Sequence, residues 1–271
     1  MADPGELLNL ARQAAGAAGR LLAERRRGGG PAVVATKSSP TDVVTEMDRA
    51  AERLIRKMIA AVRPGDAILG EEGGETGQGA AVRWIVDPLD GTVNYLYGLP
   101  DWAVSIGAEA GGSIVAGAVV VPERHEEFSA VLGGGAWLRG AGSAPVRLYC
   151  NRQVQLGQAL VATGFGYDAR RRRVQGEVLS AVLPAVRDIR RGGSCAVDMC
   201  SLATGHVDAY YERGVNYWDI AAGGLIAREA GAQVAGLHGQ AAGPSMTLAA
   251  GPGLFGELHD LLAGLDAERD G

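Results

Sequence analysis

The hydrophobic and polar positions of roughly the first 65 residues follow the three- and four-residue spacing of amphipathic helices. One series begins after Asp3, a suitable N-cap for a helix with Pro4 as its first residue, and it ends at residues 28–31. Its apolar positions are Leu7, Leu8, Ala11, Ala14, Ala15, Ala18, Leu21 and Leu22. A second helix is predicted from about Thr45 until residues 63–65, Arg-Pro-Gly, break it.

Beyond this point the pattern changes to short apolar runs that are typical of strands. Residues 67–69 and 82–86 are two such runs, and each leads directly into acidic residues. Residues 102–109 and 113–121 predict a hairpin, and residues 128–138 predict another around three glycines. The later half alternates, with strands near 159–163, 206–211 and 246–250, and helices near 172–187, at 194–204, from Asp219 and at 254–262.

Helices and strands are therefore nearly balanced, and hairpins are mixed with crossover connections. This pattern predicts a mixed α/β protein built of packed layers. We expect one unit over residues 1–271, with an N-terminal half of about residues 1–150 and a C-terminal half of about residues 151–271. The N-terminal half carries most of the candidate site residues described below.

Composition and charge narrow the class of protein. A hydrophobic content of 47% is enough for a sizeable core, and a formal net charge of −5 gives no indication of nucleic-acid binding. The longest apolar runs are too short to cross a bilayer, and the N-terminus lacks the features of a signal peptide. The three cysteines form no CxxC or Cys/His cluster, which favours a reduced, cytoplasmic protein without zinc.

Four acidic residues stand where a strand or turn leads into the next element. Glu71 follows one apolar run, Asp87 and Asp90 follow another, and Asp219 opens a predicted helix. Because Pro88 disfavours helix before it, we expect a tight turn that presents both aspartates and the Leu89 carbonyl on one side. Oxygen ligands of this kind suit Mg²⁺, and a divalent cation would relieve the repulsion among the carboxylates.

Gly91 and Thr92, which come next, complete a candidate phosphate site. Glycine allows the backbone to approach a ligand closely, and free amides at a turn or helix start attract phosphate oxygens. The three cysteines do not have the spacing of a phosphocysteine site, and the four histidines lie outside every motif. Asp87 and Asp90 are separated by two residues, whereas an aspartyl-phosphate site would need one. In-line attack by a metal-activated water is the mechanism that remains.

Several segments together resemble the inositol monophosphatase family, although each motif alone would be weak evidence. The main ones are 41–48 (TDVVTEMD), 70–72 (GEE), 87–95 (DPLDGTVNY) and 218–223 (WDIAAG). The resemblance also covers 193–200 and 208–212, and it spans about residues 5–262.

This resemblance implies a layered α/β/α/β/α fold, a homodimer and up to three Mg²⁺ ions per active site. By match of position, the implied metal ligands are Glu71, Asp87, the Leu89 carbonyl, Asp90 and Asp219. The implied catalytic group is Glu71 with Thr92 and Asp48, the last two as a dyad that prepares the water. The implied substrate-binding positions are Gly91, Thr92, Gly193, Ser194, Glu212 and Asp219.

The implied reaction is Mg²⁺-dependent hydrolysis of a small phosphorylated polyol. Inositol monophosphate is the first choice, because Asn94, Tyr95 and Glu212 match that branch of the family. Histidinol phosphate and fructose 1,6-bisphosphate are the alternatives, and a nucleotide 3′-phosphate is less favoured. A catalytically idle binding or regulatory protein is the non-enzyme alternative, against which the intact ligand set argues. No nucleic-acid or membrane partner is expected.

Some of these residues also have purely structural interpretations. Asp48 could complete a helix N-terminal cap, and Asp219 could favour a helix dipole. Glu72 could be a solvated neighbour of Glu71, and Cys195 a small buried residue. The arginine run 170–173 could be a solvated face, a dimer edge or a substrate-facing surface.

Overall fold

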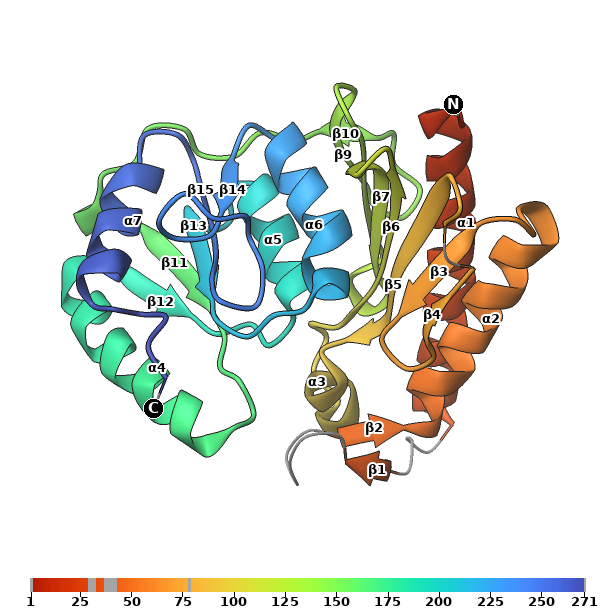
Figure 1. Ribbon diagram of the computed structural model, residues 1–271, viewed down its shortest axis with the longest axis horizontal. Helices are drawn as coiled ribbons and strands as arrows, with labels where there is room; N and C mark the ends of the chain where they lie inside the picture. The colour runs from red at the N-terminus through yellow and green to blue at the C-terminus, as the bar shows by residue number, and fades with distance from the viewer. Residues whose placement is uncertain (1, 29–32, 37–42, 78, 271) are drawn as a thin grey trace.

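The computed structural model describes residues 2–28, 33–36, 43–77 and 79–270, and it is built of alternating helical and sheet layers. Figure 1 shows the succession: α1 and α2 lie outside a first sheet, α5 and α6 lie between the two sheets, and α4 and α7 cover the far side of the second sheet. The predicted α/β/α/β/α sandwich is confirmed.

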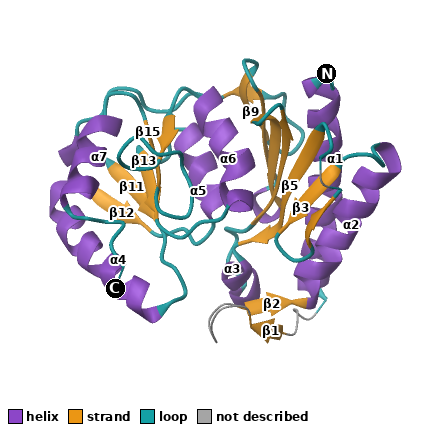
Figure 2. Cartoon of the chain, viewed as in Figure 1, coloured by secondary structure: helices purple, strands orange, loops and turns teal. Residues whose placement is uncertain are grey.

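The two N-terminal helices form where the apolar spacing predicts them, at α1 (Pro4–Arg27) and α2 (Glu46–Val62). The Asp3 carboxylate caps α1 by accepting a hydrogen bond of 2.9 Å from the Gly5 amide, and Gly28 ends the helix. Both helices pack their apolar faces on the first sheet, around Trp84 and Trp102. The short strands β1 (Val33–Thr36) and β2 (Val43–Thr45) pair antiparallel near α3 (Thr92–Tyr97), as Figure 2 shows.

The first sheet has eight strands in the order β10-β9-β8-β7-β6-β5-β3-β4. Both predicted hairpins are present in it, β6 with β7 and β8 with β9. β3 and β5 are parallel, and the other neighbours in this sheet are antiparallel. Its strands are β3 (Ala67–Gly70), β4 (Gly74–Thr76), β5 (Val82–Asp90), β6 (Ala103–Ala110), β7 (Ser113–Val121), β8 (Glu126–Val131), β9 (Gly135–Arg139) and β10 (Val146–Arg147).

The second sheet has five strands in the order β12-β11-β13-β15-β14. β11 is parallel to both of its neighbours, whereas β15 is antiparallel to β13 and β14. Its strands are β11 (Leu160–Thr163), β12 (Asp188–Arg190), β13 (Ala209–Glu212), β14 (Gln233–Ala235) and β15 (Thr247–Ala250). The helices packed around it are α4 (Ala169–Val182), α5 (Cys195–Ala203), α6 (Tyr217–Glu229) and α7 (Phe255–Gly264).

Several predicted boundaries are wrong by a few residues, and local chemistry explains the larger errors. The helix predicted at 172–187 is α4, which starts earlier because the Asp168 carboxylate caps the Arg170 and Arg171 amides. It ends earlier because Pro184 stands in a short 3₁₀ turn that follows. α6 begins at Tyr217, so Asp219 lies within its first turn and does not open it. Within the described residues, no helix is both long and apolar enough to span a membrane.

Candidate active site

A cavity of about 490 Å³ lies where the ends of strands from both sheets meet. The first sheet contributes the residues that follow β3 and the end of β5, together with the start of α3. The second half of the chain contributes the loop before α4, the loop before α5, the end of β13 and the start of α6. The predicted site residues that line the cavity are Glu71, Asp87, Leu89, Asp90, Gly91, Thr92, Gly193, Glu212 and Asp219. Asp48 and Ser194 stand behind this lining and reach it through hydrogen bonds, as described below.

The predicted tight turn at Asp87 is not formed, because β5 continues through Asp90. The strand pairs with β6 at Asp87 and again at Asp90, but three steps along β5 match two along β6. This is a β-bulge, and Pro88 at its centre has no amide to give to the ladder. The Leu89 amide instead donates a hydrogen bond of 3.0 Å to the Asp87 carboxylate. The bulge allows Asp87, Leu89 and Asp90 to line the same cavity.

The acidic side chains of the cavity act strongly on one another. Burial and the charges of Glu71, Asp90 and Asp219 raise the pKa of Asp87 well above its usual value. Burial raises the pKa of Asp219 in the same way, with Asp90 and Glu71 as the main charged neighbours. Such mutual repulsion is expensive unless a cation offsets it.

Protein donors hold two of these carboxylates in place. One oxygen of Asp90 accepts hydrogen bonds from the Ser194 hydroxyl (2.7 Å) and the Ala196 amide (2.6 Å). Burial raises the pKa of Asp90, and these hydrogen bonds oppose the rise. One oxygen of Asp219 accepts a hydrogen bond of 2.6 Å from the Asn216 amide, so Asp219 both caps α6 and lines the cavity.

Asp48 and Thr92 come together across 44 positions of sequence. The Thr92 hydroxyl lies 3.0 Å from the Asp48 carboxylate and 3.1 Å from the Leu89 carbonyl. A hydroxyl has one proton, so it donates to one of these acceptors at a time. Asp48 is 1% exposed on the first turn of α2, and its carboxylate accepts this bond from another element. Thr41 and Asp42, from the same motif, lie outside the described residues.

Two glycines let the backbone approach closely beside these groups. Gly91 has a φ of 88°, and a Cβ there would lie 3.0 Å from the Asp101 carbonyl and 3.3 Å from the Ser194 Cβ. Gly193 has a φ of 97°, and a Cβ there would lie 2.5 Å from the Arg191 guanidinium. The Asn94 side-chain amide donates a hydrogen bond of 2.9 Å to the Gly192 carbonyl and so connects this loop to α3. Both glycines are therefore required by conformation and by space.

Glu212 lies at the end of β13, beside the carboxylate cluster. One of its oxygens accepts a hydrogen bond of 2.8 Å from the Tyr210 hydroxyl. Burial raises the pKa of Glu212 to about 7, while this bond and the Arg191 charge oppose the rise. A Cβ on Gly164 would lie 1.9 Å from the Glu212 carboxylate, so a side chain at this position would displace that carboxylate.

Comparisons with known proteins assign the chain and its fold to a family. The model of the inositol monophosphatase family matches residues 3–268. The chain belongs to the inositol monophosphatase family. This result confirms the family predicted from the sequence and, with it, the predicted class of phosphoric monoester hydrolase.

Relatives of known name cover nearly the whole chain. The inositol-1-monophosphatase of Mycobacterium bovis is 48% identical over 260 residues, which are 92% of this chain and 89% of that protein. A relative from Pasteurella multocida, 38% identical over 238 residues and 86% of each chain, carries a different name, Nus factor SuhB. The solved structure of Mycobacterium tuberculosis SuhB is 42% identical, has a TM-score of 0.85, and is matched over 99% of this chain and 100% of that one.

The oxygen donors that line the cavity of this chain fit a hard divalent cation. The cavity gathers carboxylates from Glu71 (directly after β3), from β5 and from α6, together with a backbone carbonyl, and such oxygen donors suit Mg²⁺. Among the described residues, no three His, Cys, Asp or Glu side chains already stand together as a metal-binding group. The fit therefore rests on the chemistry of the donors and on their mutual repulsion.

Two arginines line the cavity: Arg191 was not identified from the sequence, and Arg171 was considered only as part of the arginine run 170–173. Arg191 lines it directly before the Gly192-Gly193-Ser194 segment, and its charge lowers the pKa values of Asp90, Asp198 and Glu212. Arg171 lines it from the first turn of α4. The position of Arg191 beside a glycine motif was a usable signal.

The structure also bears on the purely structural interpretations of the arginine run 170–173, Glu72 and Cys195. The arginine run divides, because Arg171 faces the cavity while its three neighbours in the run are exposed. Glu72 is not a solvated residue: its side chain is 7% exposed and lies 3.9 Å from Arg49. Cys195 is a buried thiol, and burial raises its pKa well above the usual value.

Proposed function

We propose that this protein hydrolyses inositol monophosphate to inositol and phosphate in the cavity between the two sheets, with Mg²⁺ as cofactor. The observation that carries the proposal is the gathering of Glu71, Asp87, Asp90 and Asp219 in one cavity with Thr92 and Glu212. The names of the mycobacterial relatives at 48% identity support the same substrate.

The metal ligands would be Glu71, Asp87, the Leu89 carbonyl, Asp90 and Asp219, with up to three Mg²⁺ ions. When bound, Mg²⁺ supplies positive charge that offsets the carboxylates and the phosphate and lowers the pKa of a water molecule. The Ser194 and Ala196 donors hold one Asp90 oxygen, which fixes the direction in which the other oxygen points.

Thr92 and Asp48 are suited to orient the attacking water. When the Thr92 hydroxyl donates to Asp48, its oxygen lone pairs can accept a hydrogen bond from a water in the cavity. The buried Asp48 carboxylate then fixes the direction of the hydroxyl and can receive a proton through it. Glu71 lines the same cavity and completes the proposed catalytic group.

The substrate ring would lie toward β13 and α5. The Glu212 carboxylate can accept a hydrogen bond from a ring hydroxyl, and its tie to Tyr210 limits its rotation. Gly91, Gly193 and Thr92 offer backbone and hydroxyl groups on the phosphate side, and Ser194 supports them from behind. Arg191 adds a positive charge that favours an anionic ligand.

Fructose 1,6-bisphosphate is the second candidate substrate, because Arg171 lines the cavity from α4 and could pair with a second phosphate. Histidinol phosphate is less well matched, since its cationic end would meet arginines. We further propose a cytoplasmic homodimer. The family resemblance supports the dimer, and the free, buried Cys150, Cys195 and Cys200 support a reducing compartment.

A substrate panel tests this proposal. Purified protein would be assayed for phosphate release from inositol monophosphate, fructose 1,6-bisphosphate, histidinol phosphate and p-nitrophenyl phosphate, with Mg²⁺ and with EDTA. The expected result is the highest kcat/KM for inositol monophosphate and no turnover in EDTA. A preference for the bisphosphate would transfer the function to the second candidate. No turnover of any ester with Mg²⁺ would favour the binding or regulatory alternative.

A further inference from the structure

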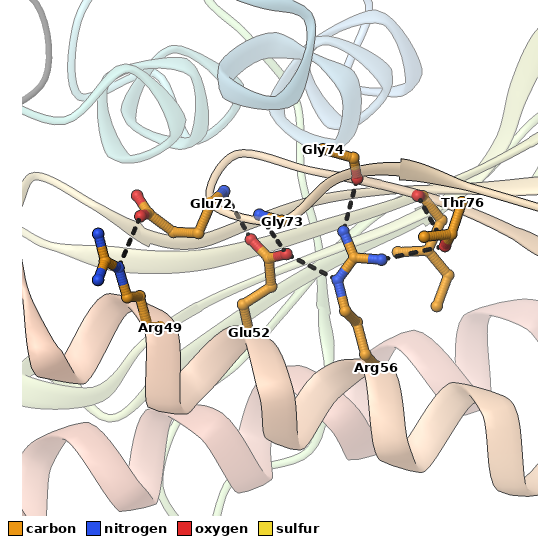
Figure 3. A network of polar contacts seen from close by, with 8 residues as sticks. Arg49, Glu52, Arg56, Glu72, Gly73, Gly74 and Thr76 are labelled. Atoms are coloured by element: carbon orange, nitrogen blue, oxygen red, sulfur yellow. Dashed lines mark hydrogen bonds and ion pairs between the residues drawn. The ribbon is translucent and has the colours of Figure 1, made fainter.

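The turn that carries Glu71 is held by a buried carboxylate from α2. Glu52 is 2% exposed, and Figure 3 shows its side chain pointing from the helix to this turn. One of its oxygens accepts a hydrogen bond of 2.8 Å from the Glu72 amide, and the other accepts one of 2.9 Å from the Gly73 amide. The two residues that follow Glu71 are therefore fixed to α2 through their backbone.

Arg56, one helical turn further along α2, holds Glu52 in position. Its Nε donates a hydrogen bond of 2.7 Å to the Glu52 carboxylate. The same guanidinium donates hydrogen bonds to the Gly74 carbonyl (2.6 Å) and to the Thr76 hydroxyl (3.1 Å). Figure 3 shows both contacts. Because an unpaired buried carboxylate would destabilise the fold, the ion pair with Arg56 stabilises Glu52 beneath the turn.

The glycines on either side of Glu71 fit around this carboxylate. A Cβ on Gly70 would lie 2.4 Å from the Glu52 carboxylate, and a Cβ on Gly73 would lie 2.6 Å from it. Neither glycine has a positive φ, so the reason for glycine at both positions is space and not conformation. The Gly-Glu-Glu-Gly sequence at 70–73 is therefore shaped to receive Glu52.

We propose that Glu52 is a positioning residue for the metal site: it fixes the turn that presents Glu71 to the cavity, and Arg56 holds the Glu52 carboxylate in its orientation. Glu52 itself does not line the cavity. This inference rests on the proposed Mg²⁺-dependent function. Residues that orient metal ligands from behind typically change metal affinity or activity by about 10- to 100-fold when they are replaced.

The test compares two substitutions of the same type. Glu52→Gln replaces one acceptor oxygen with an NH₂ group, which cannot accept a hydrogen bond from the backbone amide that faces it. Glu229→Gln is the matched control, because Glu229 also binds two glycine amides, those of Gly133 (2.7 Å) and Gly135 (2.8 Å). It lies ten residues beyond Asp219 on α6, about 15 Å along the helix.

Two properties would be measured for each protein: the Mg²⁺ concentration at half-maximal turnover, and the rise in Tm on adding Mg²⁺ to metal-free protein. Glu52→Gln is expected to raise the Mg²⁺ concentration at half-maximal turnover by about 10-fold or more. It should also reduce the rise in Tm at a given Mg²⁺ concentration. Turnover at saturating Mg²⁺ should recover most of its wild-type value. Glu229→Gln should leave the Mg²⁺ response within about twofold of wild type.

An unchanged Mg²⁺ response in Glu52→Gln would overturn the inference, as would an equal shift in Glu229→Gln. If Glu52→Gln does not fold, Arg56→Ala provides the measurement, because it removes the partner of Glu52 at a less buried position. A wild-type protein with no Mg²⁺ response would instead overturn the proposed function, so the two failures are distinguishable.

Discussion

Glu212→Gln should make the metal-free protein more stable at high pH while it weakens catalysis. Glu212 lies among acidic neighbours in the cavity, and burial raises its pKa from 4.5 to about 7. The folded protein therefore holds the proton of this carboxyl more tightly than the unfolded chain does. Glutamine cannot ionise, but its carbonyl oxygen can still accept the hydrogen bond from Tyr210.

The size and sign of the effect follow from these two pKa values. Below a pH of about 4.5 the carboxyl is protonated in both states, so it costs the folded state nothing. As the pH rises through the window between 4.5 and 7, the unfolded chain loses its proton first, and folding stability falls. Above pH 7 the full difference applies, which corresponds to about 3 kcal/mol. At a pH of about 5 the expected cost is below about 1 kcal/mol.

Urea unfolding in EDTA, at pH values of about 5 and 8.5, would measure this for wild type and Glu212→Gln. The variant is expected to gain about 2–3 kcal/mol more at the higher pH than at the lower one. Its kcat/KM for inositol monophosphate should fall by about 10- to 100-fold, and that for p-nitrophenyl phosphate far less, since the latter has no ring hydroxyls. A stability difference that is independent of pH would refute the reasoning about burial.

Three further predictions concern the dyad, a glycine and the thiols. Thr92→Ala and Asp48→Asn should each lower kcat more than they raise KM; if the two losses simply multiply in the double variant, the residues do not act as a pair. Gly164→Ala should reduce kcat/KM for inositol monophosphate, because its Cβ would overlap the Glu212 carboxylate; a Gly164→Ala enzyme with wild-type kinetics would contradict the described packing. The three cysteines, all buried and with raised pKa values, should react slowly with iodoacetamide until denaturant is added, and rapid alkylation of the native protein would show that they are accessible.

The sequence alone predicted the layers and most elements, because their signals are local. The cap at Asp3 and the glycine turns of both hairpins need only neighbouring residues to be recognised. The conformation at Asp87 could not be predicted in the same way. A tight turn and a β-bulge share the same Pro and Gly signature, and the pairing with β6 decides between them.

The candidate site shows a similar division. The ends of apolar runs, together with the family motifs, predicted the acidic residues of the cavity, whereas the positions of Arg171 and Arg191 depend on which side of a helix or loop faces the cavity. Glu52 was not identified from the sequence, because its partners Glu72 and Gly73 lie about 20 residues further along the chain. Ser194 was expected to touch substrate, but its hydroxyl is bonded to Asp90, a contact across 104 positions.

Mg²⁺-dependent hydrolysis of inositol monophosphate is tested most directly by measuring phosphate release from this ester. Wild type and Asp90→Asn would be compared with EDTA and with added Mg²⁺. Asparagine keeps an acceptor oxygen for the Ser194 and Ala196 donors, so the fold should survive, as circular dichroism would check. We expect wild-type turnover that EDTA abolishes and Mg²⁺ restores, and a loss of at least about 100-fold in Asp90→Asn. Turnover that survives EDTA, or a variant within about tenfold of wild type, would contradict this expectation.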